Sequence, residues 1–241
     1  MALPKIDVPT YDIELPVSKK KIRYRPFLVK EQRNLLMAME SEDSDAVHTA
    51  IRDILHNCTL NEDIDVEKLP IVDVEYYFLN IRAKSVGEIV ELFFPCDVDH
   101  GEQNDKAKVK ISIDLTKIDV DFPEGHTNKI ELFGEVGMIM KYPTIELMTR
   151  LENTDADDLD NIFDIVASCV DLIYEGDKIH YAKETKKSEL LDFLYNLNSE
   201  QFIKVQNFFA TLPRIKQEVE YDCPICGLHH HKVLEGMQSF F

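Results

Sequence analysis

The sequence contains only eight glycines among its 241 residues and no long apolar segment. So few glycines leave little room for phosphate-binding loops, and the patterns G-x-x-x-x-G-K-[ST], G-x-G-x-x-G and G-x-S-x-G are absent. No apolar run approaches the roughly 20 residues that a membrane-spanning helix requires. The N-terminus also lacks the basic and then apolar pattern of a signal peptide. These absences argue against a nucleotide-binding enzyme, a serine hydrolase and a membrane protein.

Basic residues are scarce as well. The chain has 27 Lys and Arg against 45 Asp and Glu, a net charge of −18. This charge argues against nucleic-acid binding, because phosphates are neutralised by Lys and Arg. The charge is uneven, since residues 1–33 contain eight basic and four acidic side chains. We expect this basic segment to bind an acidic partner or another copy of the chain, or only to protect a strand edge with solvated lysines.

Cysteine is rare, but three of the five cysteines lie in patterns typical of a zinc site. Cys223 and Cys226 lie in Cys-Pro-Ile-Cys-Gly between two predicted strands, and Cys96 follows another predicted strand. A Cys-x-x-Cys turn presents two thiolates to one metal ion, and structural zinc prefers four sulfur or imidazole ligands. An odd cysteine count with this spacing favours a reducing compartment over disulfides. The pattern therefore predicts one Zn²⁺ ion shared by two distant segments.

The fourth zinc ligand is less sharply defined. His100 is our candidate, because Gly101 follows it and allows the chain to reverse direction. Asp99 stands where a regular Cys-x-x-Cys turn would place its second cysteine, and His229 follows Cys226 by three residues. Both stay open as alternatives. The predicted metal site consists of Cys96, His100, Cys223 and Cys226.

A redox pair or an unmetallated pair is the competing interpretation of Cys223 and Cys226. A thioredoxin-like pair opens a helix after a strand, whereas this pair lies in a predicted hairpin. A catalytic zinc needs an open coordination position and a nearby base, and no H-E-x-x-H pattern occurs. A closed structural site that pins so long a loop would offset about 4 kcal/mol of closure entropy. Cys58 and Cys169 lie on apolar helical faces and are expected in the core.

The hydrophobic pattern predicts the fold class α+β. Helical periodicity predicts helices at 27–40, 44–58, 70–81, 144–152, 156–174, 187–197 and 199–211, with a polar bridge at 175–185. Alternation predicts strands at 11–15, 21–25, 88–94, 108–114, 129–133, 136–142 and 214–221. We therefore expect helical segments that flank a small antiparallel β module clasped by a structural zinc site.

This pattern divides the chain into five regions. We expect a proline-rich β arm at 1–26, an N-terminal helical region at 27–86, a β module with the first zinc half-site at 87–142, a C-terminal helical region at 143–212, and a strand with the Cys-Pro-x-Cys-Gly turn at 213–241. The terminal Phe240 and Phe241 either enter a partner or pack back on the zinc module.

No catalytic constellation stands out, and we expect no enzymatic activity. Four aspartates crowd the start of the helix predicted at 156–174: Asp155, Asp157, Asp158 and Asp160. They lack the EF-hand spacing and favour the helix dipole instead. We expect the isolated histidines to serve packing or the surface rather than general-base chemistry: His48, His56, His126 and His180.

Several segments in order resemble one family. The most specific segment is 69–88, with Leu69-Pro70, Asp73-x-Glu75 and Ile81-Arg82-Ala83-Lys84-Ser85. It is preceded by the segment 25–33 and followed by the Cys-Pro-x-Cys-Gly turn and the segment 234–241. Together they resemble the baseplate hub and hub-assembly proteins of T-even-like contractile-tailed bacteriophages. Relatives often have Cys-x-x-Cys in the first half-site, where this chain has Cys96 and Asp99.

The resemblance implies a structural or assembly component of a phage tail baseplate hub that acts by protein–protein docking. It implies other hub or tail proteins as partners, with self-association through the basic arm as a further option. It implies a location in the virion tail and, during assembly, in the host cytoplasm. The alternatives are an assembly chaperone absent from the mature virion, a zinc-ribbon protein that binds nucleic acid, and a metal-dependent hydrolase.

Overall fold

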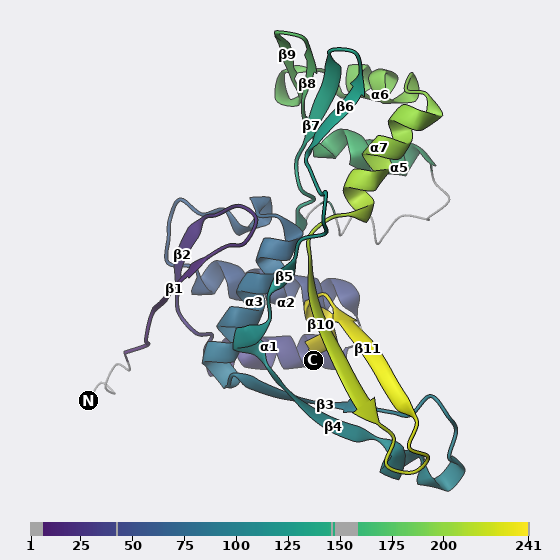
Figure 1. Ribbon diagram of the computed structural model, residues 1–241. Helices are drawn as coiled ribbons and strands as arrows, with labels where there is room; N and C mark the ends of the chain where they lie inside the picture. Colours follow the sequence, from purple (N-terminus) through teal and green to yellow (C-terminus); the bar gives the residue numbers. More distant parts are fainter. Residues whose placement is uncertain (1–6, 42, 146, 148–158, 241) are drawn as a thin grey trace, which may run out of the picture. The chain divides into compact units, whose positions relative to one another are not determined.

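The computed structural model describes residues 7–41, 43–145, 147 and 159–240. They divide into two compact units, and the predicted class α+β is confirmed. Unit 1 takes its residues from 1–66, 72–121 and 214–241, and unit 2 takes its residues from 67–71 and 122–213. Figure 1 shows the elements of each unit. The β module expected at 87–142 is divided, because its first hairpin lies in unit 1 and its second in unit 2.

The helices of unit 1 lie where their periodicity predicts them. They are α1 (Val29–Glu40), α2 (Ser44–Cys58) and α3 (Ile71–Val86). α2 begins after Asp43, whose carboxylate accepts the backbone N–H of Asp45 and so caps the helix. Tyr77, Phe78 and Ile81 of α3 are fully buried, which makes α3 the central helix of this core.

The N-terminal hairpin is part of the core of unit 1. It consists of β1 (Tyr11–Glu14) and β2 (Lys21–Tyr24), and both Leu15 and Ile22 are completely buried. The buried carboxylate of Asp73 on α3 accepts the backbone N–H groups of Val17 and Ser18, each at 2.8 Å. The segment expected as an arm is therefore joined to α3 by apolar packing and by two charged hydrogen bonds.

Two long antiparallel hairpins of unit 1 lead to Cys96, Cys223 and Cys226. The first joins β3 (Ile89–Phe94) to β4 (Val109–Asp114). The second joins β10 (Arg214–Asp222) to β11 (His229–Glu235), and β10 also pairs with β5 (Val120–Asp121). Tyr221 contacts the ring of Phe94 and donates its hydroxyl hydrogen to the carbonyl of Pro95. The ends of the two hairpins therefore lie side by side (Figure 1).

The C-terminal segment decides between the two alternatives left open for Phe240. The 3₁₀ turn η5 (Met237–Phe240) places Phe240 in the core, where its side chain has no exposed surface. The backbone N–H of Met237 donates to the carboxylate of Glu75 on α3 at 3.3 Å. Phe240 is thus not available to a partner and packs within its own chain, while Phe241 lies outside the described residues.

Unit 2 is a four-stranded antiparallel sheet with helices. Its strands, in spatial order, are β6 (Lys129–Phe133), β7 (Val136–Met140), β8 (Val170–Glu175) and β9 (Lys178–Tyr181). Its helices are α5 (Leu159–Cys169), α6 (Lys187–Tyr195) and α7 (Ser199–Ala210). Their apolar sides meet in a core around Met138, Leu194 and Val205.

The prediction of a helix at 156–174, followed by a polar bridge at 175–185, is wrong in part. α5 ends at Cys169, and the chain continues directly as β8, which pairs with β7 and β9. The segment from Val170 to Tyr174, apolar except for Asp171, suits a strand as well as a helix, and pairing with β7 decides for the strand. Of the helix expected at 144–152, only positions 144, 145 and 147 are among the described residues. Three of the four clustered aspartates also lie outside the described residues.

Candidate metal centre

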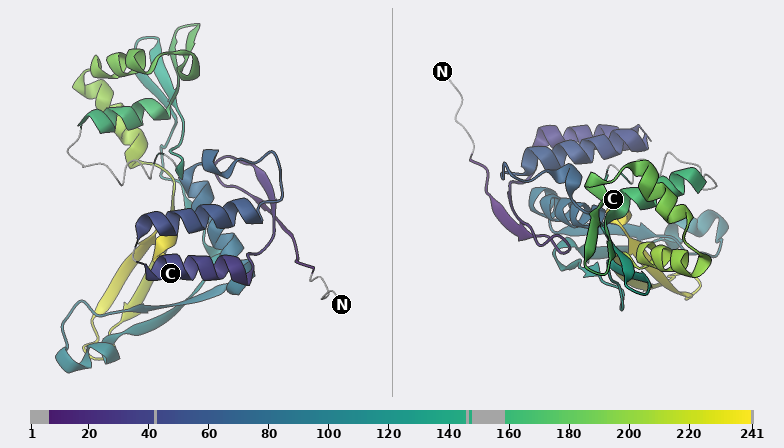
Figure 2. Two further views of the ribbon diagram at one scale, coloured as in Figure 1. Left: turned by 180° about the vertical axis from the view of Figure 1, so that it is seen from behind. Right: turned by 90° about the horizontal axis from the view of Figure 1, so that it is seen from above.

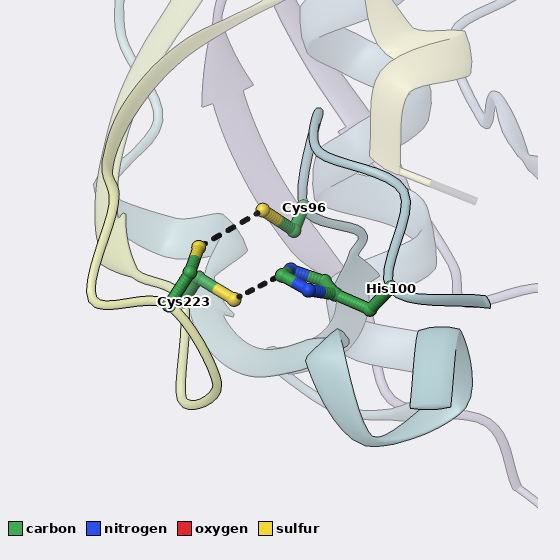
Figure 3. Close-up of side chains that lie close together, drawn as sticks. Cys96, His100 and Cys223 are labelled. Atoms are coloured by element: carbon green, nitrogen blue, oxygen red, sulfur yellow. Dashed lines mark hydrogen bonds between the residues drawn. The ribbon is translucent and has the colours of Figure 1, made fainter. Parts of the chain in front are cut away.

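The structure brings the four predicted ligands together. Cys96 follows β3, His100 precedes the 3₁₀ helix η2 (Gly101–Ala107), and Cys223 and Cys226 lie in the turn between β10 and β11. Their ligand atoms all lie within 4.8 Å of one another. Figure 3 shows the side chains of Cys96, His100 and Cys223 directed toward a common point. Two hairpins that are distant in sequence therefore supply one cluster.

The turn that carries the two C-terminal cysteines is shaped by its backbone. The N–H of Cys223 donates to the carbonyl of Leu228, and the N–H of Gly227 donates to the carbonyl of Cys223, both at 2.9 Å. Gly227 has a φ of +70°, which only glycine adopts without strain. This tight loop directs both thiols to the same side.

The two alternative ligands are engaged elsewhere. One carboxylate oxygen of Asp99 accepts the N–H of Gly101 at 2.9 Å and the amide of Asn104 at 2.8 Å. His229 pairs with Asp222 at 2.8 Å. Among the described residues, only His100 joins the three cysteines within ligand distance. The geometry therefore favours His100 as the fourth ligand.

Two distances within the cluster match those expected for a tetrahedral zinc ion. Two sulfurs bound at ~2.3 Å to such an ion lie ~3.8 Å apart, and a sulfur and an imidazole nitrogen lie ~3.6 Å apart. The Sγ atoms of Cys96 and Cys226 are 3.8 Å apart. The Sγ of Cys223 lies 3.5 Å from Nε2 of His100. The spacing and the soft donor set both suit Zn²⁺.

The local backbone also favours a thiolate at Cys223. Burial raises the pKa of this thiol, but the N–H groups of Cys226 and Ile225 and the thiols of Cys226 and Cys96 stabilise the thiolate and lower the pKa to about 6. Desolvation and the neighbouring sulfurs raise the pKa of Cys96. Cys223 is therefore prepared for a cation, whereas Cys96 would lose its proton only as a cation binds.

A second cross-link, not anticipated from the sequence, lies beside the cluster. Asp97 accepts hydrogen bonds from Lys232 at 2.8 and 3.0 Å and contacts Nδ1 of His230 at 3.2 Å. The buried His230 stacks on Tyr221, its partner across the β10–β11 ladder. We call Asp97, His230 and Lys232 the Asp97 clamp. The i, i+2 spacing of His230 and Lys232 on one strand face was its only sequence signal.

The other histidines are placed apart from this cluster. In unit 2, His126 contacts the hydroxyls of Thr211 at 2.9 Å and Tyr142 at 3.1 Å and stacks on Phe208. Burial lowers its pKa, which favours a neutral packing residue. His180 is exposed on β9, whereas His48 and His56 lie on α2.

The chain is similar to known proteins over nearly its whole length. The family model described as T4 bacteriophage base plate protein matches residues 8–241. The chain belongs to this base plate protein family. One relative, the baseplate hub assembly protein gp26 of Enterobacteria phage T4, is 24% identical over 232 residues, which cover 96% of this chain and 97% of the relative. The resemblance expected from segment 69–88 is thereby confirmed.

Two further observations concern this base plate family member. No solved structure shows significant similarity to the chain. Among the described residues, no helix has the length and apolar character needed to cross a membrane. The family match extends over segments of both units.

Proposed function

We propose that this base plate protein acts in building the hub of a phage tail baseplate, by binding other baseplate proteins rather than by catalysis. The observation that carries the proposal is the match to gp26 of phage T4, a baseplate hub assembly protein, over nearly the full length of both chains. The protein then acts in the infected bacterial cell and at the tail baseplate.

We propose further that Cys96, His100, Cys223 and Cys226 hold a structural Zn²⁺ ion. Four protein ligands close a tetrahedral site and leave no position for a substrate or a reactive water. The ion would join two hairpins whose cysteines are separated by 130 positions in the chain. Its role is to make the meeting point of these hairpins rigid, so that a partner meets a preformed surface.

The surroundings of the cluster favour a protein partner over nucleic acid. Acidic side chains flank both half-sites along the chain: Asp97, Asp99, Glu218, Glu220 and Asp222. Such a rim repels phosphate and suits a partner with basic side chains. We therefore propose heterotypic docking to a basic surface of another hub or tail protein, with self-association through residues 1–26 as a further option.

The proposal is tested in a phage whose gene for this chain is inactivated. We expect the yield of infectious particles to fall by several orders of magnitude, and expression of the chain in the host to restore it. Electron microscopy of the mutant lysate is expected to show incomplete hubs or baseplates. Normal particles in the absence of the protein would contradict an assembly role. Mass spectrometry of purified virions then distinguishes a retained subunit from a chaperone that leaves.

The Asp97 clamp yields a separate prediction. Asp97→Asn removes the negative charge that Lys232 faces, while it keeps the size of the side chain. We expect zinc affinity to fall by about tenfold, because groups that orient a metal site from outside typically contribute 10–100-fold. The measurement is competition with a fluorescent chelator. Asp105→Asn, which changes an exposed aspartate paired with Lys108 in the same loop, is the control and should leave affinity unchanged. Equal affinities for both variants would show that the clamp does not position the site.

A further inference from the structure

The outer face of α1 is apolar although it faces solvent. Val29 is 80% exposed, Leu36 is 51% exposed and Met37 is 57% exposed. The opposite face of the same helix packs inward through Glu31, Leu35 and Ala38. Figure 2 (left) shows α1 and α2 side by side on the outside of unit 1. The exposed apolar residues are therefore not needed for the contact of α1 with its own core.

These residues surround a shallow groove. It has a volume of about 350 Å³ and is lined by Val29, Gln32, Arg33, Leu36, Met37 and Glu40. Positions 29, 33, 36 and 40 follow one another at intervals of four, three and four, so they form one stripe along the helix. Contiguous apolar surface with a charged rim is typical of a protein-binding face. Among the described residues, no other helix displays so dense a set of exposed apolar side chains.

The charges of this stripe are arranged for a second copy of the same helix. Its N-terminal half carries Lys30 and Arg33, while its C-terminal end carries Glu40 and is followed by Asp43. Arg33 lies three residues before Leu36, and Glu40 lies three residues after Met37. A two-fold axis between Leu36 and Met37 therefore sets Arg33 of each copy against Glu40 of the other. The basic end of each helix meets the acidic end of its partner.

A parallel arrangement of the two α1 helices is unfavourable. A parallel pair of α1 helices would place Lys30 and Arg33 against like charges. An isologous contact, by contrast, needs a patch that is complementary to itself under a two-fold rotation. The stripe meets this condition in its charges and in its apolar centre, where Leu36 faces Met37 of the second copy. This self-complementarity identifies a second copy of the chain as the occupant of the groove.

We propose that the protein forms a two-fold symmetric dimer through antiparallel packing of the outer faces of α1. The contact buries Leu36 and Met37 at its centre, while Val29, which this axis sets opposite position 44 beyond the end of α1, lies at its edge. One pair of short helices buries less surface than the 1,200–2,000 Å² typical of stable complexes. The dimer is therefore weak and depends on protein concentration. This contact involves neither the metal centre nor the β1–β2 hairpin, and it stands independently of the proposed hub function.

Charge reversal tests the dimer directly. Sedimentation velocity is measured over a concentration series for the full chain and for Arg33→Glu, Glu40→Arg and the double variant. Each single reversal replaces two attractive pairs by two repulsive pairs, so we expect the dissociation constant to rise about tenfold. The double variant restores opposite charges at the same places, and we expect near-native dimerisation. Because Arg33 and Glu40 are exposed, the melting temperature should not change.

A matched control distinguishes dimerisation through α1 from self-association through the β1–β2 hairpin. Lys20→Glu makes a similar charge reversal at an exposed position of the β1–β2 turn, and we expect it to leave the dissociation constant unchanged. A wild-type chain that stays monomeric at all concentrations would overturn the proposal. Equal weakening by the single and double variants would also overturn it. Dissociation caused by Lys20→Glu alone would assign self-association to the hairpin instead.

Discussion

Replacement of Cys223 by Ser is expected to abolish metal binding and to lower the melting temperature of unit 1 by about 10 °C. The proposed ion would pin two hairpins whose closure costs about 4 kcal/mol of chain entropy, and 1 kcal/mol corresponds to about 2–4 °C in a chain of this size. A serine hydroxyl is a poor zinc ligand, so three remaining donors would not hold the ion tightly. Metal content of the purified protein and calorimetric melting give the two measurements.

Two further variants make this experiment specific. Cys96→Ser should have the same effect as Cys223→Ser, because the two residues come from different hairpins but share one site. Cys169→Ser makes the same chemical change at a buried cysteine of unit 2 and should leave the metal content unchanged. One zinc per chain in the Cys223→Ser variant, or an unaltered melting curve for unit 1, would refute the structural role of the cluster.

The second large effect is expected at Asp73. Its fully buried carboxylate accepts the N–H groups of Val17 and Ser18, which lie in the turn between β1 and β2. Asp73→Ala leaves two backbone donors without their partner, and each costs roughly 1–3 kcal/mol. We therefore expect the free energy of unfolding to fall by about 4 kcal/mol. Asp73→Asn keeps the shape and one acceptor oxygen, and its loss should be about half as large.

Urea unfolding, followed by circular dichroism and by limited proteolysis of the hairpin, measures this loss. The matched control is Asp12→Ala, which removes an exposed carboxylate of β1 that lies 3.6 Å from Arg23. Exposed ion pairs contribute about 0–1 kcal/mol, so the control should be nearly neutral. If Asp73→Ala were as mild as Asp12→Ala, the hairpin would be a detachable arm rather than a part of the core.

Local sequence patterns predicted much of unit 1. The apolar residues of α2, at Val47, Ile51, Ile54, Leu55 and Cys58, follow helical spacing, and the helix has the bounds that this spacing implies. The alternation between 108 and 114 likewise predicted β4. In both cases the signal lies within a few turns or residues of the element itself. The run at 170–174 fits either period, and its pairing with β7 comes from a distant part of the chain.

Local sequence patterns did not predict which residues near the chain ends are buried. Prolines and basic residues in the first 26 positions predicted an arm, yet Leu15 and Ile22 are completely buried, and Phe240 is buried as well. Burial depends on which element covers a side chain, and here α3 supplies both Asp73 and Glu75 as partners. The sequence pattern of one segment does not show which other element packs over it.

The sequence by itself determined that Cys223 and Cys226 lie on one tight turn, because the spacing of two residues and Gly227 act locally. It also named Cys96 and His100 as candidates. Only the tertiary structure placed His100, rather than Asp99 or His229, within ligand distance of the three cysteines. That choice depends on how the β3–β4 loop meets the β10–β11 turn, 130 positions away, and on the Asp97 clamp that holds them together. Contacts of that range follow from packing and not from spacing along the chain.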